Sequence, residues 1–279
     1  MKIGLKSYPK RHALPGKNIN LIFSLSYLTV LVILPLLFLI LSLKDVTWEK
    51  ASEMLHSKRA LDAFWVSFSL SIFAAAIDLF FGVIIAWVLV KYDFFGKRLL
   101  DSIVDLPFAM PTAVSGIALA AIYSNNGWMG KYLGEIGIKV SYTQLGILIA
   151  LIFIGLPFVV RAIQPAVEGL DKDMEEAAAS LGATRPTILR TIVFPQLFPS
   201  MLTGFTMALA RGLGEYGSVI FIAGNIPYLT EILPLLIVIE LEQFDYESAT
   251  VLAVAMLAAS FILLVVLGFI GNQLKKRYG

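Results

Sequence analysis

Glu176-Ala177-Ala178 opens a run of small and polar residues that continues through Gly182 to Ile192-Val193-Phe194-Pro195, inside an otherwise apolar chain. Alanine has the highest helix propensity of all residues. Gly182 is placed to end a first helix, because glycine tolerates the left-handed conformation found just beyond a helix end. The run therefore predicts two short helices joined by a turn, with a low alanine surface that another protein can approach closely.

The ends of both predicted helices carry sequence signals. Asp173 and Glu176 have the spacing of a capping box, so we expect Asp173 to cap the first helix. Thr184 and Pro186 can start the second helix, because proline suits a first turn. We expect Pro195 to break the helical pattern before the next apolar segment.

The spacing E-A-A-x3-G-x9-I-x-F-P resembles the EAA loop of ABC-importer permeases, which usually has Leu where this chain has Phe194. In that family the loop forms a cytoplasmic coupling helix that docks into a groove on an ATPase. A solvated connector between two membrane helices is the alternative interpretation. The resemblance implies a coupling loop over about residues 168–198 and an ATPase-coupling role for Glu176, Ala177, Ala178, Gly182, Ile192 and Pro195.

The composition is that of a membrane protein. The chain is 58% hydrophobic and only 15% charged, and it has several runs of about twenty residues with few or no charges, each of which is typical of a bilayer span. A net charge of +2 gives no reason to expect a nucleic-acid partner. The absence of cysteine excludes disulfides and thiolate metal sites, and His12 and His56 lie too far apart in sequence to suggest a metal site. We therefore expect no metal or cofactor in this chain.

Six apolar runs predict six transmembrane helices. The first is too long for the apolar region of a signal peptide, and no small-residue cleavage site follows it. The predicted organisation is a cytoplasmic segment 1–18, one six-helix membrane domain 19–270 and a cytoplasmic tail 271–279. The expected spans cover approximately residues 19–43, 64–90, 103–123, 145–160, 199–223 and 249–270.

The basic residues set the predicted orientation. With the N-terminus inside the cell, the inner segments hold fifteen Lys and Arg residues and the outer segments hold six. Both termini and the EAA-like loop, between the fourth and fifth spans, are then cytoplasmic. Residues 224–247 contain five acids and no base, which fits an outer loop.

The chain has no G-x-x-x-x-G-K-[ST] phosphate-binding loop, so ATP and Mg²⁺ would be bound by a separate ATPase. Residues 212–217 match G-x-G-x-x-G, but they lie in an apolar span, where glycines favour close helix packing or a local break. No serine, acid and base are grouped for hydrolysis, and we predict that the chain is not an enzyme. Asp101 and Asp105, near Lys97 and Arg98, favour an ion-pair cluster over a catalytic pair.

Besides Asp105, three charges lie within predicted spans, where a charge is costly and usually faces a pore or a partner. Arg211 and Glu215 are four residues apart, hence on one helix face. Arg211 would lie about 18 Å along a helix that starts at Pro199, near the middle of the membrane. It either lines an anion pathway or pairs with Glu215, and the pair is favoured. Asp78 either marks a water-filled cavity or pairs with a basic residue on a neighbouring helix, and again the pair is favoured.

From about residue 60 to the C-terminus the chain resembles one subgroup of these permeases, the T subunit of bacterial sulfate/thiosulfate importers. Molybdate and tungstate permeases share much of the pattern and remain an alternative. The carrying residues are Asp105–Gly116, Pro157–Arg161 with Gln164-Pro165, Gly214–Asn225 and Phe244-Asp245-Tyr246.

The resemblance implies an all-α integral membrane protein with a type I ABC-importer permease fold, in the inner membrane of a bacterium. The implied partners are two copies of a cytoplasmic ATPase, a second related permease and an extracytoplasmic sulfate-binding protein. An ion-coupled secondary anion carrier, with Asp78 and Glu215 as coupling groups, is a further alternative, although it leaves the cytoplasmic loop unexplained. An integral membrane enzyme is disfavoured because no catalytic set is clustered.

Overall fold

The structure is a computed structural model that describes residues 16–278, so most of the predicted segment 1–18 and Gly279 of the predicted tail lie outside the described residues. The chain divides into two compact units between Thr47 and Trp48. In the first unit, α1 (Lys17–Leu28), a π-helical turn (Thr29–Ile33), α2 (Leu34–Leu41) and a 3-10 turn (Ser42–Asp45) follow one another without a break. Residues 18–45 are long and apolar enough to cross a membrane, as predicted for the first span.

The second unit is built from helices, and no strand occurs in residues 16–278. Five helices of the described chain, including the one in the first unit, are long and apolar enough to span a bilayer. The elements of the second unit are α3 (Trp48–His56), α4 (Lys58–Lys91), α5 (Lys97–Val104), α6 (Leu106–Ala109), α7 (Thr112–Tyr123), α8 (Trp128–Glu135), α9 (Gln144–Glu168), α10 (Lys172–Ser180), α11 (Arg185–Ile188), a π-helical turn (Leu189–Val193), α12 (Phe194–Leu213), α13 (Val219–Ala223), α14 (Leu233–Glu242) and α15 (Tyr246–Tyr278).

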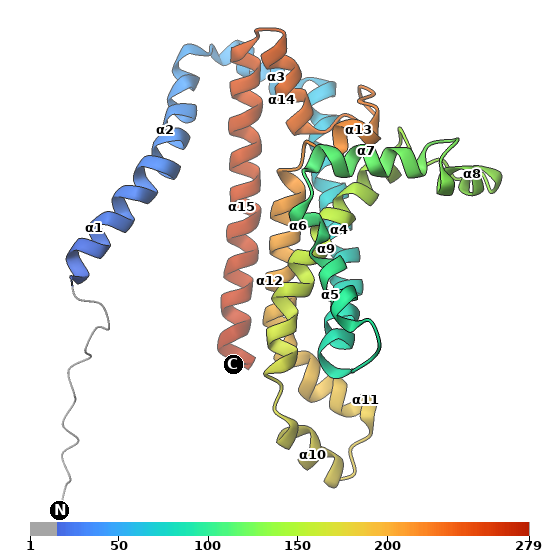
Figure 1. Cartoon of the computed structure of the whole chain (residues 1–279). Helices are drawn as coiled ribbons and strands as arrows, with labels where there is room; N and C mark the ends of the chain where they lie inside the picture. The colour runs from blue at the N-terminus through green and yellow to red at the C-terminus, as the bar shows by residue number, and fades with distance from the viewer. Residues whose placement is uncertain (1–15, 279) are drawn as a thin grey trace, which may run out of the picture. The chain divides into compact units, whose positions relative to one another are not determined.

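The centre of the second unit is the packing of α4, α9 and α12, which make the most extensive contacts with one another, while α15 packs against α12 and α14 (Figure 1). Glycines bring the three backbones close together. A Cβ at Gly82 of α4 would run into the side chain of Val159 of α9, and one at Gly204 of α12 would lie 3.1 Å from the Cα of Val159. Small residues at helix contacts are typical of membrane bundles, because dispersion contacts replace the hydrophobic effect there.

The predicted third span is not one helix. Residues 103–123 are divided among α5, α6 and α7, with breaks at Asp105 and at Met110-Pro111. Met110 has an extended backbone, with φ −88° and ψ 133°, as the residue before a proline prefers. Because α7 has only 12 residues, it is shorter than a bilayer span, and the count of six crossings stays a prediction.

The predicted fifth span, 199–223, is also wrong in its limits. A continuous helical run of 29 residues extends from Arg185 to Leu213, and α13 is a separate short helix. Pro195 therefore does not break the helix. It lies in the first turn of α12, directly after the π-helical turn, whose wider i→i+5 bonding gives room for a residue that lacks a backbone N–H.

The start of α7, after the break at Met110-Pro111, packs against the turn that follows the end of α12 at Leu213. Gly116 of α7 is buried, and a Cβ there would collide with the backbone of Ser218, in the turn between α12 and α13. A Cβ at Gly217 would likewise collide with the side chain of Thr112. The glycines of the 212–217 motif thus serve a local break and a close approach, as predicted from their place in an apolar span.

We predict that Gly116→Ala destabilises the protein by about 1–3 kcal/mol, because the added methyl group meets a backbone that cannot move aside. Gly134→Ala in α8 is the matched control, since nothing lies within 4 Å of a Cβ there. The measurement is the thermal midpoint of the purified, detergent-solubilised protein. Equal midpoints for the two variants would contradict the close packing of α7 on residues 214–218.

Candidate functional site

The first helix of the predicted coupling loop is α10, and its cap differs from the prediction. Asp171 is the N-cap, with an extended backbone (φ −74°, ψ 110°), and its side chain accepts a hydrogen bond of 2.9 Å from the N–H of Asp173. Asp173 is already inside the helix, so it cannot adopt the non-helical conformation that a cap requires. Asp173 and Glu175 instead place negative charge in the first turn, where the helix dipole favours it.

The C-terminal end of α10 confirms the prediction for Gly182. This residue has φ +85°, and its N–H donates to the carbonyl of Ala179 at 2.9 Å. The N–H of Ala183 donates to the carbonyl of Ala178 at 3.0 Å. These two bonds form a Schellman motif, which needs a left-handed residue at the glycine position.

The second helix of the loop begins as predicted. Thr184 is the N-cap of α11, with an extended backbone, and Pro186 lies in its first turn. The hydroxyl groups of Thr184 and Thr187 are 2.9 Å apart, which closes the turn on its solvent side. The segment is therefore a helix, a glycine turn and a second helix (Figure 1).

The six predicted coupling residues fall into two groups. Glu176, Ala177 and Gly182 are exposed, whereas Ala178 and Ile192 pack against the core of α4, α9 and α12, and Pro195 is half-buried. A further exposed residue lies beside Gly182, and the sequence analysis did not identify it. Leu181 is 90% exposed at the end of α10. The sequence could have identified Leu181, because a leucine directly before a helix-ending glycine, within a polar run, has no apolar neighbours in the chain to pack against.

A pocket of about 440 Å³ adjoins this surface and joins it to α4. Trp87 near the end of α4 and Tyr92 just beyond it line one side, and Glu175, Glu176 and Arg185 are among the residues on the other. The end of α4 is thus a neighbour of the coupling loop, which the sequence did not indicate.

Arg211 and Glu215 form the predicted ion pair, with 2.6 Å between Nη1 and Oε2. Glu215 is buried, and its Oε1 also accepts hydrogen bonds from the N–H (2.8 Å) and the hydroxyl (2.9 Å) of Ser218. The depth of Arg211 in the membrane stays a prediction, but the helical run begins at Arg185 and not at Pro199. Arg211 lies about 39 Å along it, in the last turn of α12.

Asp78 of α4 does not form the predicted pair with a basic residue. Its side chain is 1% exposed, and neither carboxylate oxygen has a hydrogen-bond partner among the described residues. The carboxylate lies against Gly155 of α9, in the space that a Cβ there would occupy.

Asp101 and Asp105 belong to an ion-pair cluster, as predicted, but their cation is Arg161 of α9. Arg161 donates to both oxygens of Asp105 and, at 2.8 Å, to Asp101. Lys97, which was expected to contribute, pairs with Asp93 instead at 2.9 Å. Arg161 was placed beyond the fourth span, but α9 continues to Glu168, so Arg161 lies within the helix.

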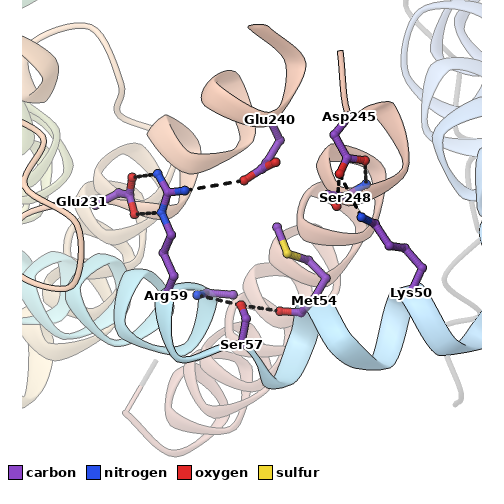
Figure 2. A network of polar contacts seen from close by, with 9 residues as sticks. Lys50, Met54, Ser57, Arg59, Glu231, Glu240, Asp245 and Ser248 are labelled. Carbon is purple, nitrogen blue, oxygen red and sulfur yellow. Dashed lines mark hydrogen bonds and ion pairs between the residues drawn. The ribbon is translucent and has the colours of Figure 1, made fainter. Parts of the chain in front are cut away.

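Three of the five acids in residues 224–247, namely Glu231, Glu240 and Asp245, belong to a second network of ion pairs (Figure 2). Arg59 of α4 makes two hydrogen bonds to Glu231, of 2.8 and 2.6 Å, and approaches Glu240 at 3.9 Å. Lys50 of α3 lies 3.0 Å from Asp245. The cations that balance these acids therefore come from α3 and the start of α4, some 170 to 195 residues earlier in the chain.

Asp245 also caps α15. Its carboxylate accepts the N–H of Ser248 at 3.0 Å and the hydroxyl of Ser248 at 2.8 Å. The backbone hydrogen bond from Ser248, together with Lys50, holds the pKa of Asp245 below its ordinary value. The same contact raises the pKa of Lys50.

Residues 78–279 match the family model described as "Binding-protein-dependent transport system inner membrane component". The chain belongs to this family. Curated relatives include the "Sulfate transport system permease protein CysT" of Salmonella typhimurium and that of Escherichia coli, each 42% identical over 96% of both chains. The protein of the same description from Synechococcus elongatus is 42% identical over 90% of both chains.

Solved structures share the fold of this permease at low sequence identity. A bacterial ABC transporter that imports the polysaccharide alginate matches with a TM-score of 0.75 and 15% identity, over 91% of this chain and 94% of that one. The MetNI methionine transporter matches with a TM-score of 0.53 and 18% identity, over 78% of this chain and 95% of that one. The fold is therefore that of a type I ABC-importer permease, as the sequence resemblance implied.

We predict that the stability contributed by Asp245 depends on pH. Because its folded pKa is lowered, this contribution is present above the unfolded pKa and is lost as the pH falls through the folded pKa. Asp245→Asn should lower the free energy of unfolding at neutral pH by about 1 kcal/mol or less, and with it the thermal midpoint. The decrease of the midpoint in acid should be smaller in this variant than in the natural protein. Asp93→Asn is the control, because Asp93 is fully exposed in its pair with Lys97. An unchanged acid profile in Asp245→Asn would refute the prediction.

Proposed function

We propose that this chain is the transmembrane permease subunit of an ATP-driven importer of sulfate or thiosulfate. The observation that carries the proposal is 42% identity, over 96% of both chains, to relatives described as sulfate transport permeases. The exposed EAA-like surface supports the ATP-driven part, because it has the form of a docking element and carries no chemistry of its own.

The proposed assembly contains two copies of a cytoplasmic ATPase, which bind ATP and Mg²⁺, and a second related permease that completes the pathway. An extracytoplasmic sulfate-binding protein delivers the anion. The alginate transporter of the same fold was solved in complex with a periplasmic protein, which supports this last partner. The excess of basic residues in the predicted inner segments supports six crossings of the bacterial inner membrane with both termini cytoplasmic.

The coupling surface is placed to move the membrane core. The exposed residues Glu176, Ala177, Leu181 and Gly182 contact the ATPase. Ala178 and Ile192, on the opposite side, pack onto the core shared by α4, α9 and α12. A displacement of α10 by the ATPase is therefore passed to α9 and α12, the two helices that the loop connects.

We place Arg211 and Glu215 on the anion pathway. The side chain of Arg211 is 30% exposed, whereas that of Glu215 is 2% exposed and is held by Ser218, so Glu215 orients the cation without blocking it. α12 ends at Leu213, between the two residues of this pair, and broken helices at membrane depth commonly line substrate routes. Asp78, the third predicted pathway residue, is 1% exposed, so we do not place it on the pathway.

Uptake of labelled sulfate in bacteria that lack this chain, with and without the restored chain, tests the proposal. We expect uptake to return with the chain, to require the ATPase subunit and to survive collapse of ion gradients while ATP is maintained. Preferential competition by molybdate would favour the molybdate/tungstate alternative. Uptake that persists without the ATPase and stops with the ion gradient would establish the secondary-carrier alternative.

The coupling surface can be probed because the chain has no cysteine. We predict that Ala177→Cys, placed alone, forms a crosslink to a cysteine introduced on the ATPase, whereas Glu135→Cys on α8 does not. Both positions are exposed, so reactivity alone would not distinguish them.

A membrane-impermeant thiol reagent should label Glu135→Cys from outside and Ala177→Cys only after permeabilisation. Labelling of Ala177→Cys in intact cells would overturn the orientation.

The docking role of Leu181 gives a further measurement. Leu181→Glu should reduce sulfate uptake by about tenfold or more, because a charge then enters an apolar contact with the ATPase. Membrane insertion and the amount of chain should be unchanged, since Leu181 contributes nothing to the core. Normal uptake by this variant would argue that α10 does not dock.

A further inference from the structure

Asp78 is a buried acid for which the transport mechanism above has no use. It lies on α4 where this helix packs against α9 and α12, with its carboxylate against Gly155 of α9. No ion pair joins it to any cation in the described part of the chain. The cations on the packed helices are engaged elsewhere: Arg161 of α9 with Asp101 and Asp105, and Arg211 of α12 with Glu215.

The surroundings of Asp78 decide in which protonation state its carboxyl group can form a hydrogen bond. An ionised carboxylate only accepts hydrogen bonds, and the surrounding helix backbones offer carbonyl oxygens rather than free N–H groups. A protonated carboxyl group can donate to such a carbonyl. Leaving a buried polar group without a partner costs free energy, and an isolated buried charge costs far more.

The position of Gly155 indicates the candidate acceptors by analogy with a serine side chain. The Oδ2 atom of Asp78 lies in the space of the missing Gly155 side chain. A serine hydroxyl at a helix position sits in a similar place and commonly donates to a carbonyl three or four residues earlier in its own helix. The corresponding acceptors here are the carbonyls of Leu151 and Ile152, each of which has a second lone pair in addition to its helical bond.

We propose that Asp78 carries its proton in the folded protein and donates it to a main-chain carbonyl in the turn of α9 before Gly155. This makes Asp78 a positioning residue that fixes α4 to α9 without any net charge. The link lies within the same three-helix packing that receives the coupling loop through Ala178 and Ile192. This hydrogen bond therefore keeps α4 and α9 in a fixed alignment, so that the two helices move together during transport. Asp78 is then not an ion-coupling group.

Four variants test the proposal in the complete transporter. Asp78→Asn keeps the shape and a hydrogen-bond donor without a proton to lose, and should transport sulfate within about twofold of the natural protein. Asp78→Ala removes the donor and leaves a void, and Gly155→Ala forces the carboxyl group out of its place. Each should reduce uptake by about tenfold, the equivalent of one lost buried hydrogen bond or one packing defect. The double variant Asp78→Ala with Gly155→Ala should recover much of the loss, because the new methyl group fills the vacated space.

Infrared spectroscopy of the purified complex gives a readout that does not depend on transport. We expect a carbonyl band of a protonated carboxylic acid that is absent in Asp78→Asn and unchanged across neutral pH. The pH profile of uptake should be the same in Asp78→Asn and in the natural protein. The other ionisable groups on the three helices, which could change that profile, are Lys58, Arg59, Asp62 and Lys91 of α4, Arg161 and Glu168 of α9, and Arg211 of α12.

Two results would overturn the proposal. The absence of the acid band would mean that Asp78 is ionised. Loss of transport in Asp78→Asn, with a normal amount of assembled complex, would mean that the acid itself is needed, as an ion-coupling group would be. If all sulfate uptake failed for reasons outside this site, the infrared band would still decide the protonation of Asp78, so failure of the proposed function can be told apart from failure of this inference.

Discussion

The close approach of the α4, α9 and α12 backbones is the constraint on which the rest of the structure depends. Val159 of α9 is held between Gly82 on one side and Gly204 on the other, where no larger residue fits. In a membrane this contact has little hydrophobic driving force, so dispersion and shape supply the stability. The coupling loop joins α9 to α12, and therefore both of its ends are attached to one tightly packed block. In the proposed function, this attachment lets a protruding loop act on the membrane core.

Hydropathy and spacing predicted the parts of the fold that local sequence controls. α4, α9 and α15 coincide with long apolar runs, and Gly182 ends α10 because only a left-handed residue fits there. Prolines were the main source of error. Pro107 and Pro111 accompany helix breaks, whereas Pro157 and Pro165 lie inside a continuous α9. The local pattern is similar in both cases, and the difference comes from packing: α9 is buried between α4 and α12, which support a weakened helix, while α6 and α7 have no such enclosure.

Among the charged sites, too, only the pair that is close in sequence could be predicted. Arg211 and Glu215 are one helical turn apart, so their pair was predictable from spacing alone. Arg161 with Asp105, and Arg59 with Glu231, join residues separated by 56 and 172 positions, and no local rule identifies such partners. The environment of Asp78 depends on a missing side chain at Gly155, which becomes informative only once the two helices are placed together.

The unbroken run from Arg185 to Leu213 has a mechanical consequence. In the proposed function, one end of this 29-residue run adjoins the loop that contacts the ATPase, and the other end carries the guanidinium group of Arg211. Two features between these ends can bend the helix: the wide turn at Leu189–Val193 and Pro199 inside α12. Under the proposed coupling, a displacement at the base would rotate the far end as well as translate it. Inserting a single residue just after Val193 would rotate Arg211 by about 100° around the helix axis and would misplace its charge relative to the proposed anion pathway.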